Sequence, residues 1–95
     1  MMIFVTPQDT DNRFVIYLKT DTCKVQYGPE GLQFQAALPR INIMKDFFIN
    51  YGIKQVEVRE NGQDAILIMH DKAVFMQMED LDNISGMKVP ILTVI

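Results

Sequence analysis

Residues 55–78 of the chain read QVEVRENGQDAILIMHDKAVFMQM, and this stretch decides the predicted fold. Asn61-Gly62 is a strong signal for a two-residue hairpin loop, because a type I′ turn needs two residues that accept positive φ angles. A second reversal is predicted at Asp71-Lys72, between two further runs of apolar residues. The stretch therefore predicts a three-stranded antiparallel meander.

The two predicted turns specify one consistent register. The first turn places Val58 opposite Ala65. The second turn places Met69 opposite Val74. Because side chains alternate between the faces of a strand, both turns sort the same apolar residues onto one face, which we expect to belong to the core. These residues are Val56, Val58, Ala65, Leu67, Met69, Val74, Met76 and Met78.

The opposite face of this predicted sheet is polar around an apolar island of Ile66, Ile68 and Phe75. Apolar surface within a polar rim is typical of a contact site for another molecule. Burial of the three side chains would contribute about 4–6 kcal/mol before association costs. The alternative is internal: the helix or the other sheet covers the island and makes it a second core layer.

A second meander is predicted over residues 13–37, where three runs of alternating apolar residues follow one another. The runs are Phe14, Ile16 and Leu18, then Cys23, Val25 and Tyr27, then Leu32, Phe34 and Ala36. Loops at residues 19–22 and 28–31 set the register between them. The predicted pairs are Leu18 with Cys23, Tyr27 with Leu32 and Val25 with Phe34.

A helix is predicted from Arg40 to Tyr51, between the two meanders. Pro39 suits the first turn of a helix, and Gly52 suits the position just after its end. Apolar residues recur at three- and four-residue spacing, and two more widen this stripe until the helix is mostly buried. The stripe consists of Ile41, Met44, Phe48 and Tyr51, widened by Ile43 and Phe47.

Both terminal segments are predicted to be edge strands. Met2–Val5 is a short apolar strand that Pro7 ends. Val89–Ile95 is also apolar, but Pro90 lacks the N–H group that a central strand needs. An apolar edge strand invites pairing with another chain, so Ile91–Ile95 is predicted to join two copies into a homodimer.

These elements predict an α+β fold: two antiparallel three-stranded meanders flanking one central helix, with short N- and C-terminal edge strands. At 95 residues, we expect a single small α+β domain spanning residues 1–95. The net charge of −3, with basic residues scattered along the chain, makes nucleic acid an unfavoured partner. No apolar run reaches the ~20 residues of a membrane-spanning helix. A lone cysteine and seven methionines favour the cytoplasm over an oxidising compartment.

Few residues are candidates for catalysis. Cys23 falls on the apolar side of its predicted strand, where a free cysteine behaves as a small buried hydrophobe. His70 falls at a strand end beside a turn, where a solvated imidazole is expected. We therefore predict no catalytic residue, no cofactor and no enzyme activity. An enzyme that uses Cys23 or His70 stays as a further hypothesis, which rapid alkylation of the folded protein would support.

Metal ligands are equally sparse. Asp9-x-Asp11-Asn12 resembles the start of a calcium loop, but the glycine of its sixth position and the glutamate of its twelfth are missing. One histidine and one cysteine do not supply the usual zinc ligands. The acidic residues 79–82 could hold a cation or a basic partner, but a solvated turn is the plainer interpretation. The sequence therefore predicts no metal site.

Two segments resemble parts of the sliding DNA clamps of eukaryotes and archaea. Residues 23–37, with GLQFQA at their centre, resemble the strand hairpin of a clamp domain. Residues 77–82, QMEDLD, followed by Val89-Pro90, resemble the end of a clamp domain, where the interdomain connector begins. The chain departs from the clamp pattern at its N-terminal segment, which is predicted to form strands where a clamp domain has an early basic helix. The resemblance implies a clamp-like DNA-replication module and assigns no site residues.

Because no catalytic constellation is present, the sequence favours a non-enzymatic protein-interaction module that acts through a sheet face or edge. A small regulator, inhibitor or accessory subunit, a viral one included, fits this description. The predicted partner is another protein chain, a second copy of this one included, and not a membrane. The predicted interaction residues are Ile66, Ile68, Phe75, Ile91 and Val94. The alternative function is the sliding-clamp-like DNA-replication module.

Overall fold

The computed structural model describes residues 1–19, 21–79, 82, 86 and 88–94. Its elements along the chain are β1 (Met2–Pro7), β2 (Phe14–Leu18), β3 (Lys24–Gly28), β4 (Gly31–Ala37), α1 (Leu38–Asn50), β5 (Val56–Asn61), β6 (Asp64–Met69), β7 (Ala73–Met78) and β8 (Ile91–Val94). The strands form two four-stranded sheets: sheet A in the order β7-β1-β2-β8, and sheet B in the order β3-β4-β6-β5. Neighbouring strands are antiparallel except for β2 and β8, which are parallel. The predicted α+β class, with one helix in the described residues and antiparallel sheets, is confirmed.

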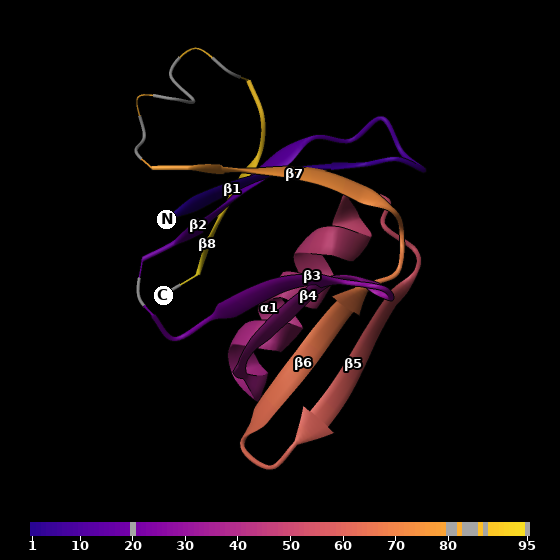
Figure 1. Cartoon of the computed structure of the whole chain (residues 1–95), viewed down its shortest axis with the longest axis vertical. Helices are drawn as coiled ribbons and strands as arrows, with labels where there is room; N and C mark the ends of the chain where they lie inside the picture. Colours follow the sequence, from indigo (N-terminus) through magenta and orange to yellow (C-terminus); the bar gives the residue numbers. More distant parts are fainter. Residues whose placement is uncertain (20, 80–81, 83–85, 87, 95) are drawn as a thin grey trace.

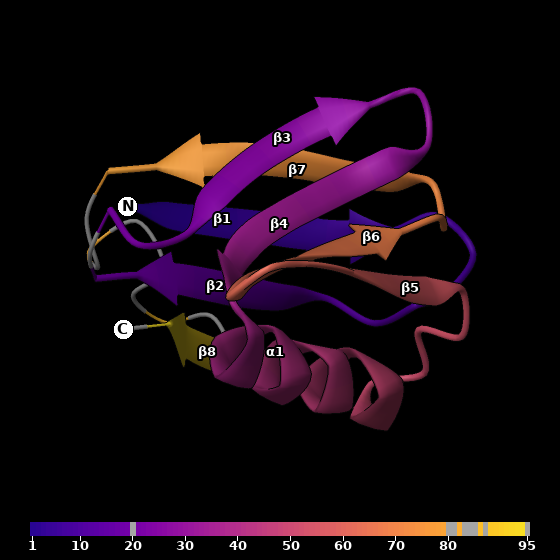
Figure 2. The same cartoon turned by 90° about the horizontal axis from the view of Figure 1, so that it is seen from below.

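The two sheets face each other, and α1 lies along one side of the space between them (Figure 1). On the other side, β3 of sheet B lies beside β7 of sheet A (Figure 2). The rings of Tyr27 on β3 and Phe75 on β7 join these two edges, with their centroids 5.3 Å apart. The helix contacts β4, β5 and β6 of sheet B and β8 of sheet A. It therefore closes the side that β5 and β8 leave open.

Three phenylalanines connect the layers at the centre of the core. Phe14 belongs to sheet A, Phe34 to sheet B and Phe48 to α1, and all three are fully buried. The ring centroid of Phe48 lies 5.4 Å from that of Phe14 and 5.6 Å from that of Phe34. Burial of one such ring contributes about 1.5–3 kcal/mol, so Phe48 ties the helix to both sheets.

The helix starts two residues before the predicted Arg40 and ends one residue before the predicted Tyr51. Pro39 lies in the first turn, where its missing N–H group costs nothing. At the other end, Gly52 has a φ angle of 85° and follows the C-cap residue Tyr51. The N–H group of Gly52 donates to Ile49 O, and that of Ile53 donates to Phe48 O, which is the hydrogen-bond pattern of a Schellman motif.

The predicted burial of the helix is only partly right. Ile41, Met44 and Phe48 are buried, as their spacing predicts, but Ile43 is 60% exposed. Because α1 lies at the side of the two sheets rather than between their centres, only one face of it contacts the core. The expectation that the helix is mostly buried was therefore wrong.

The hairpin of β5 and β6 forms, but with a different register from the predicted one. Val58 lies opposite Leu67, and the two-residue loop is Gly62-Gln63. Gly62 has a φ angle of 70°, and Gln63 does not have a positive one. A type II′ turn, with glycine as its first central residue, fits these angles. Because the partner shifts by two residues, each side chain keeps its predicted face.

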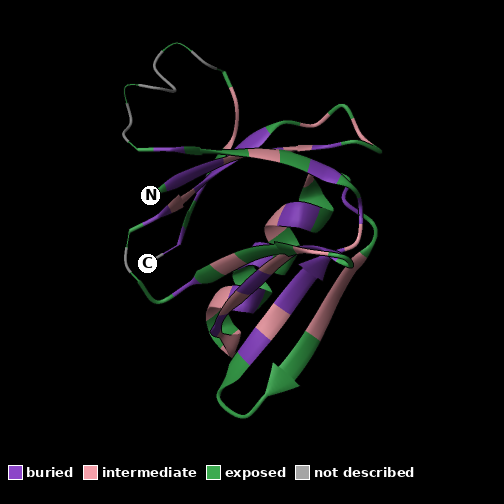
Figure 3. Cartoon of the chain, viewed as in Figure 1, coloured by how far each residue is buried: buried purple, intermediate pink, exposed green. Residues whose placement is uncertain are grey.

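β7 is where the prediction fails. It pairs with β1 in sheet A and not with β6. Both edges of β6 are already occupied, by β4 and β5, so the turn at Asp71-Lys72 carries the chain from sheet B to sheet A. As a result, Ala73 and Phe75 contact the core, whereas Val74 and Met76 are 59% and 60% exposed. Figure 3 shows this alternation along β7.

The prediction for the N-terminal half is also only partly right. The hairpin of β3 and β4 has the predicted pairs, Tyr27 with Leu32 and Val25 with Phe34. Leu18 does not pair with Cys23, because β2 lies between β1 and β8 and has no free edge. β1 is an inner strand, not an edge strand, whereas β8 is at an edge as Pro90 predicts.

Candidate functional site

The outer face of sheet A, which points away from sheet B, carries no charged side chain on the described strands. Alternation along the strands and the register between them place the same set of side chains on this face. They are Val74, Met76 and Met78 on β7, Met2, Phe4 and Thr6 on β1, Val15 and Tyr17 on β2, and Ile91 and Thr93 on β8. An apolar sheet face without charge is unusual on the surface of a protein unless something covers it.

One apolar row crosses all four strands of this face. Met76 lies opposite Phe4, Phe4 opposite Val15, and Val15 opposite Ile91. The middle of the row is covered, since Val15 is fully buried. Its two ends are not, since Met76 is 60% and Ile91 is 48% exposed.

A small second core explains why the middle of the face is covered. Met2, Val15 and Met78 form a buried cluster on the outer side of sheet A. Val89, which precedes β8 in the chain, packs against this cluster together with Phe4 and Tyr17. The remaining exposed apolar side chains are therefore at the β7 and β8 edges.

Those edges are also where backbone groups can accept a further strand. β7 and β8 are the outermost strands of sheet A. A groove of about 230 Å³ follows β8, lined by Arg40 and Ile43 of α1 and by Thr93 and Val94 of β8. An unpaired strand edge beside apolar surface is a site at which another chain can dock.

The predicted interaction residues are not brought together. Ile66 and Ile68 lie on the outer face of sheet B, while Phe75 lies in sheet A and packs into the core. The predicted apolar island of these three residues therefore does not form. Ile91 is exposed, but Val94 is buried in the core.

Val74 and Met76 are the surface residues that sequence reasoning missed. Their alternation with Ala73 and Phe75 was visible in the sequence, but it does not say which of the two sets faces inward. Pairing with β1 decides which set faces the core, because Phe75 lies opposite the buried Val5.

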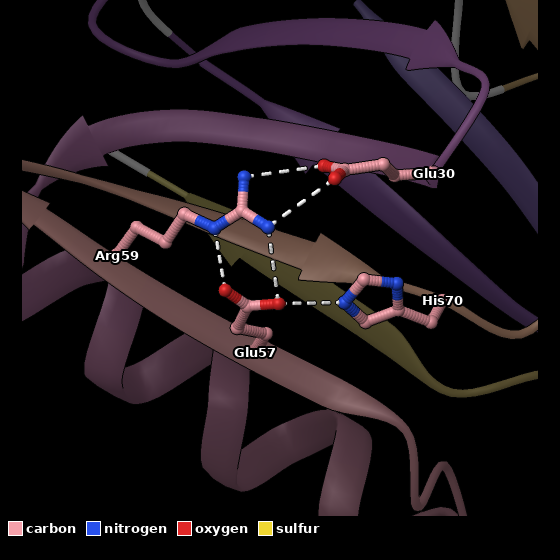
Figure 4. Close-up of polar contacts among 4 residues, drawn as sticks. All are labelled: Glu30, Glu57, Arg59 and His70. Carbon is pink, nitrogen blue, oxygen red and sulfur yellow. Dashed lines mark hydrogen bonds and ion pairs between the residues drawn. The ribbon is translucent and has the colours of Figure 1, made fainter.

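A polar cluster covers part of the outer face of sheet B (Figure 4). Arg59 forms a two-bond contact with Glu30, with Nη1 3.2 Å from Oε2 and Nη2 3.3 Å from Oε1. Its Nε donates to Oε2 of Glu57 at 2.5 Å, and His70 Nε2 lies 2.8 Å from Oε1 of Glu57. The side chains come from the β3–β4 turn, from β5 and from the end of β6.

This cluster accounts for the burial of Ile68. The cross-strand neighbours of Ile68 are Glu57 on β5 and Gln33 on β4, so the polar side chains lie around an isoleucine that is almost completely buried. Long polar side chains often shield apolar surface in this way. The cluster thus covers a residue that the sequence predicts to be an interaction residue.

The cluster is poorly suited to acid–base catalysis. The hydrogen bond from Arg59, and after it the one with His70, lowers the pKa of Glu57 below its ordinary value. Hydrogen bonds to Glu57 and Glu30 raise the pKa of Arg59. A general base needs a pKa near the working pH, and the lowered pKa of Glu57 lies further from neutral pH than that of an ordinary glutamate.

Cys23 and His70 do not form a nucleophilic pair. Cys23 precedes β3 at one end of sheet B, whereas His70 follows β6 at the other end. Burial raises the pKa of the Cys23 thiol to about 11, although the charge of Arg40 opposes the shift. A thiol with such a pKa is almost entirely protonated at neutral pH and is a weak nucleophile.

The described residues contain no group of three or more His, Cys, Asp or Glu side chains that could hold a metal ion. Within the same part of the chain, no helix has the length and hydropathy needed to cross a bilayer. No family model, curated protein or solved structure matches the chain. The chain's own surface is therefore the guide to its function.

Proposed function

We propose that the protein is a non-enzymatic interaction module that pairs with a second copy of itself through the outer face of sheet A. The observation that carries the proposal is the uncharged apolar row whose ends, Met76 and Ile91, are exposed. In a two-fold dimer each face meets its own copy, so a charged face would repel itself. A face without charge can pack against its own copy despite the net charge of −3 on the chain.

The expected strength of this dimer follows from the exposed side chains. Val74, Met76 and Ile91 are each about half exposed, so burying the remainder contributes about 1 kcal/mol per side chain. Two copies together gain about 6 kcal/mol from these residues. Association costs of about 4–15 kcal/mol offset most or all of that gain. The dimer is therefore expected to be weak and to depend strongly on protein concentration.

Sedimentation equilibrium over a wide concentration range tests this proposal. The expected result is a concentration-dependent dimer for the natural chain. Met76→Glu should abolish it, because each copy would bury an unpaired carboxylate in an apolar interface. Ile49→Glu is the matched control, since Ile49 is a similarly exposed isoleucine on α1 and the charge change is the same. A strict monomer at high concentration would refute self-association, and a dimer that survives Met76→Glu would exclude this face.

A regulator, an inhibitor or an accessory subunit in the cytoplasm, viral or cellular, is the role that fits such a module. The clamp-like alternative stays a prediction and has its own test. Salt-dependent retention of the protein on DNA would favour it, because binding to phosphates releases counterions. Absence of any DNA effect at low salt would remove it.

A further inference from the structure

The free edge of β8 can accept a further strand. β8 is the outermost strand of sheet A, and on the side of β2 Val15 N donates to Pro90 O. The N–H and C=O groups of one residue point to the same side of a strand, and this side alternates from residue to residue. Since Pro90 points toward β2, Ile91 and Thr93 direct their backbone groups to the free edge. The edge therefore offers two donors and two acceptors to an added strand.

The helix α1 lies beside this edge (Figure 2). The groove of about 230 Å³ between them is lined by Arg40 and Ile43 from α1 and by Thr93 and Val94 from β8. Strand addition to an exposed sheet edge is a recurrent way in which proteins bind extended peptides, and pockets for alternate side chains give it specificity. The groove is such a pocket, placed next to the free edge.

Ile43 gives the groove an apolar part. Its side chain is 60% exposed, and the buried Val94 of β8 lies at the same groove. Every second side chain of an added strand would point to this side of sheet A. An apolar side chain at one of these positions would cover Ile43 and remove its surface from water.

Arg40 gives the groove a positive charge, since it is the one charged residue of the lining. It lies in the first turn of α1, which has no acidic residue. Its guanidinium forms no ion pair with another residue in the described part of the chain. The positive end of the helix dipole adds to its charge. A carboxylate is therefore the group that this part of the groove favours.

We propose that the groove between α1 and β8 binds an extended segment of another protein, which adds as a strand to β8. This segment carries an apolar side chain over Ile43 and an acidic side chain, two residues away, at Arg40. The two positions on α1 are about 4.5 Å apart along the helix axis. Alternate residues of a strand are about 6.6 Å apart, and the long arginine side chain spans the difference. β8 itself has no acidic side chain, so a second copy fits the groove less well.

Fluorescence polarisation of a labelled peptide with the sequence TETITET tests the proposal. The sequence reads the same in both directions, so either strand direction places the isoleucine over Ile43 and a glutamate at Arg40. The expected result is saturable binding. The peptide TKTITKT, with lysine in place of glutamate, should bind at least about fivefold more weakly. No saturable binding of TETITET below about 1 mM would refute the site.

Arg40→Glu should reverse this preference, so that TKTITKT binds more tightly than TETITET. Lys45→Glu is the matched control, because it makes the same change of charge at an exposed position of α1 that does not line the groove. The control should keep the preference of the natural chain. If both variants change the preference equally, the effect belongs to the net charge of the chain, and the role of Arg40 is wrong.

N-methylation of the peptide tests the pairing with the backbone of β8. In an antiparallel pairing the N–H of the threonine before the isoleucine bonds to β8, and in a parallel pairing the N–H of the isoleucine does. A methyl group on one of these two nitrogens should therefore abolish binding, and a methyl group on the other should be tolerated. Equal effects of the two modifications would refute strand addition.

Two further measurements separate this site from self-association. Met76→Glu should bind TETITET as the natural chain does, because Met76 lies on β7, at the opposite edge of sheet A. Loss of the dimer and loss of this site are therefore distinguishable. A peptide of residues 90–94, PILTV, should bind more weakly than TETITET. Equal or tighter binding of PILTV would assign the groove to a second copy of the chain and would overturn the proposal.

Discussion

Replacement of Gly31 by alanine tests the pairing of β4 with β6, which joins the two halves of sheet B. Gly31 opens β4 and has a φ angle of 130°. A Cβ atom added there would overlap the Met69 carbonyl oxygen of the adjoining strand, and it would lie 3.0 Å from Met69 C and 3.3 Å from His70 Cα. All of these are backbone atoms, so no flexible side chain can move aside.

Two costs add in this variant. An alanine in the left-handed region of φ costs about 1–2 kcal/mol. The steric overlap requires a backbone shift. By analogy with overpacked cores, this shift costs a further amount of about 1–3 kcal/mol. Gly31→Ala should therefore destabilise the protein by about 2–5 kcal/mol, with a midpoint of about 3.5 kcal/mol. That is a large fraction of the roughly 5–15 kcal/mol that stabilises a domain.

Gly62→Ala separates the two costs. Gly62 also has a positive φ angle, 70°, but an added Cβ there would meet no atom within 4 Å. Only the backbone cost applies, and the reduced freedom of the unfolded chain offsets about 0.4–1 kcal/mol of it. We expect a loss of about 1 kcal/mol, so the Gly31 variant should melt about 10–20 °C below the Gly62 variant.

Thermal and urea unfolding followed by circular dichroism measure both variants against the natural chain. The m-value should stay constant, because the surface exposed on unfolding does not change. Equal destabilisation by the two substitutions would show that residue 31 does not lie against Met69. The pairing of β4 with β6 would then be wrong.

Two further predictions concern single side chains. Because burial raises the pKa of Cys23 to about 11, only about one thiol in a thousand is ionised at pH 8. Alkylation of Cys23 in the folded protein should therefore be at least about 100-fold slower than in urea. Rapid alkylation in the folded state would revive a nucleophilic role for this residue. The folded-state pKa of Glu57 is lowered by Arg59 and then by His70, so its contribution to stability is present above the unfolded value of 4.5 and is lost as pH falls through the lower folded value. Glu57→Gln should accordingly destabilise the protein at neutral pH and match the natural chain at strongly acidic pH, and a stability difference that does not depend on pH would contradict the ion-pair geometry.

Local signals in the sequence were reliable wherever the contact they predict is also local. Pro39 and Gly52 located the ends of the helix to within about two residues, because capping depends on neighbours in the chain. The hairpin of β3 and β4 formed with its predicted pairs. At Asn61-Gly62 the loop position was off by one residue because glycine took the first central position and not the second.

Signals that needed a distant partner were incomplete. Alternation identified Val74 and Met76 as sharing a face, but it could not say whether that face is inside, because a period of two is the same in both cases. The predicted apolar island failed for the same reason, since it assumed that Phe75 and Ile66 belong to one sheet. Asp71 was recognised only as a turn residue, because its burial depends on loops that are distant in the sequence.

The sequence by itself determined the α+β class, the helix and two hairpins, since each of these depends on residues a few positions apart. Only the tertiary structure decided which strands share a sheet. β6 has two edges, and β4 and β5 occupy both, so β7 had to cross to β1. That competition for strand edges turned Met76 outward and buried Asp71 where the chain crosses between the sheets. Because strand edges are filled by segments far apart in the chain, no short window of sequence contains the information.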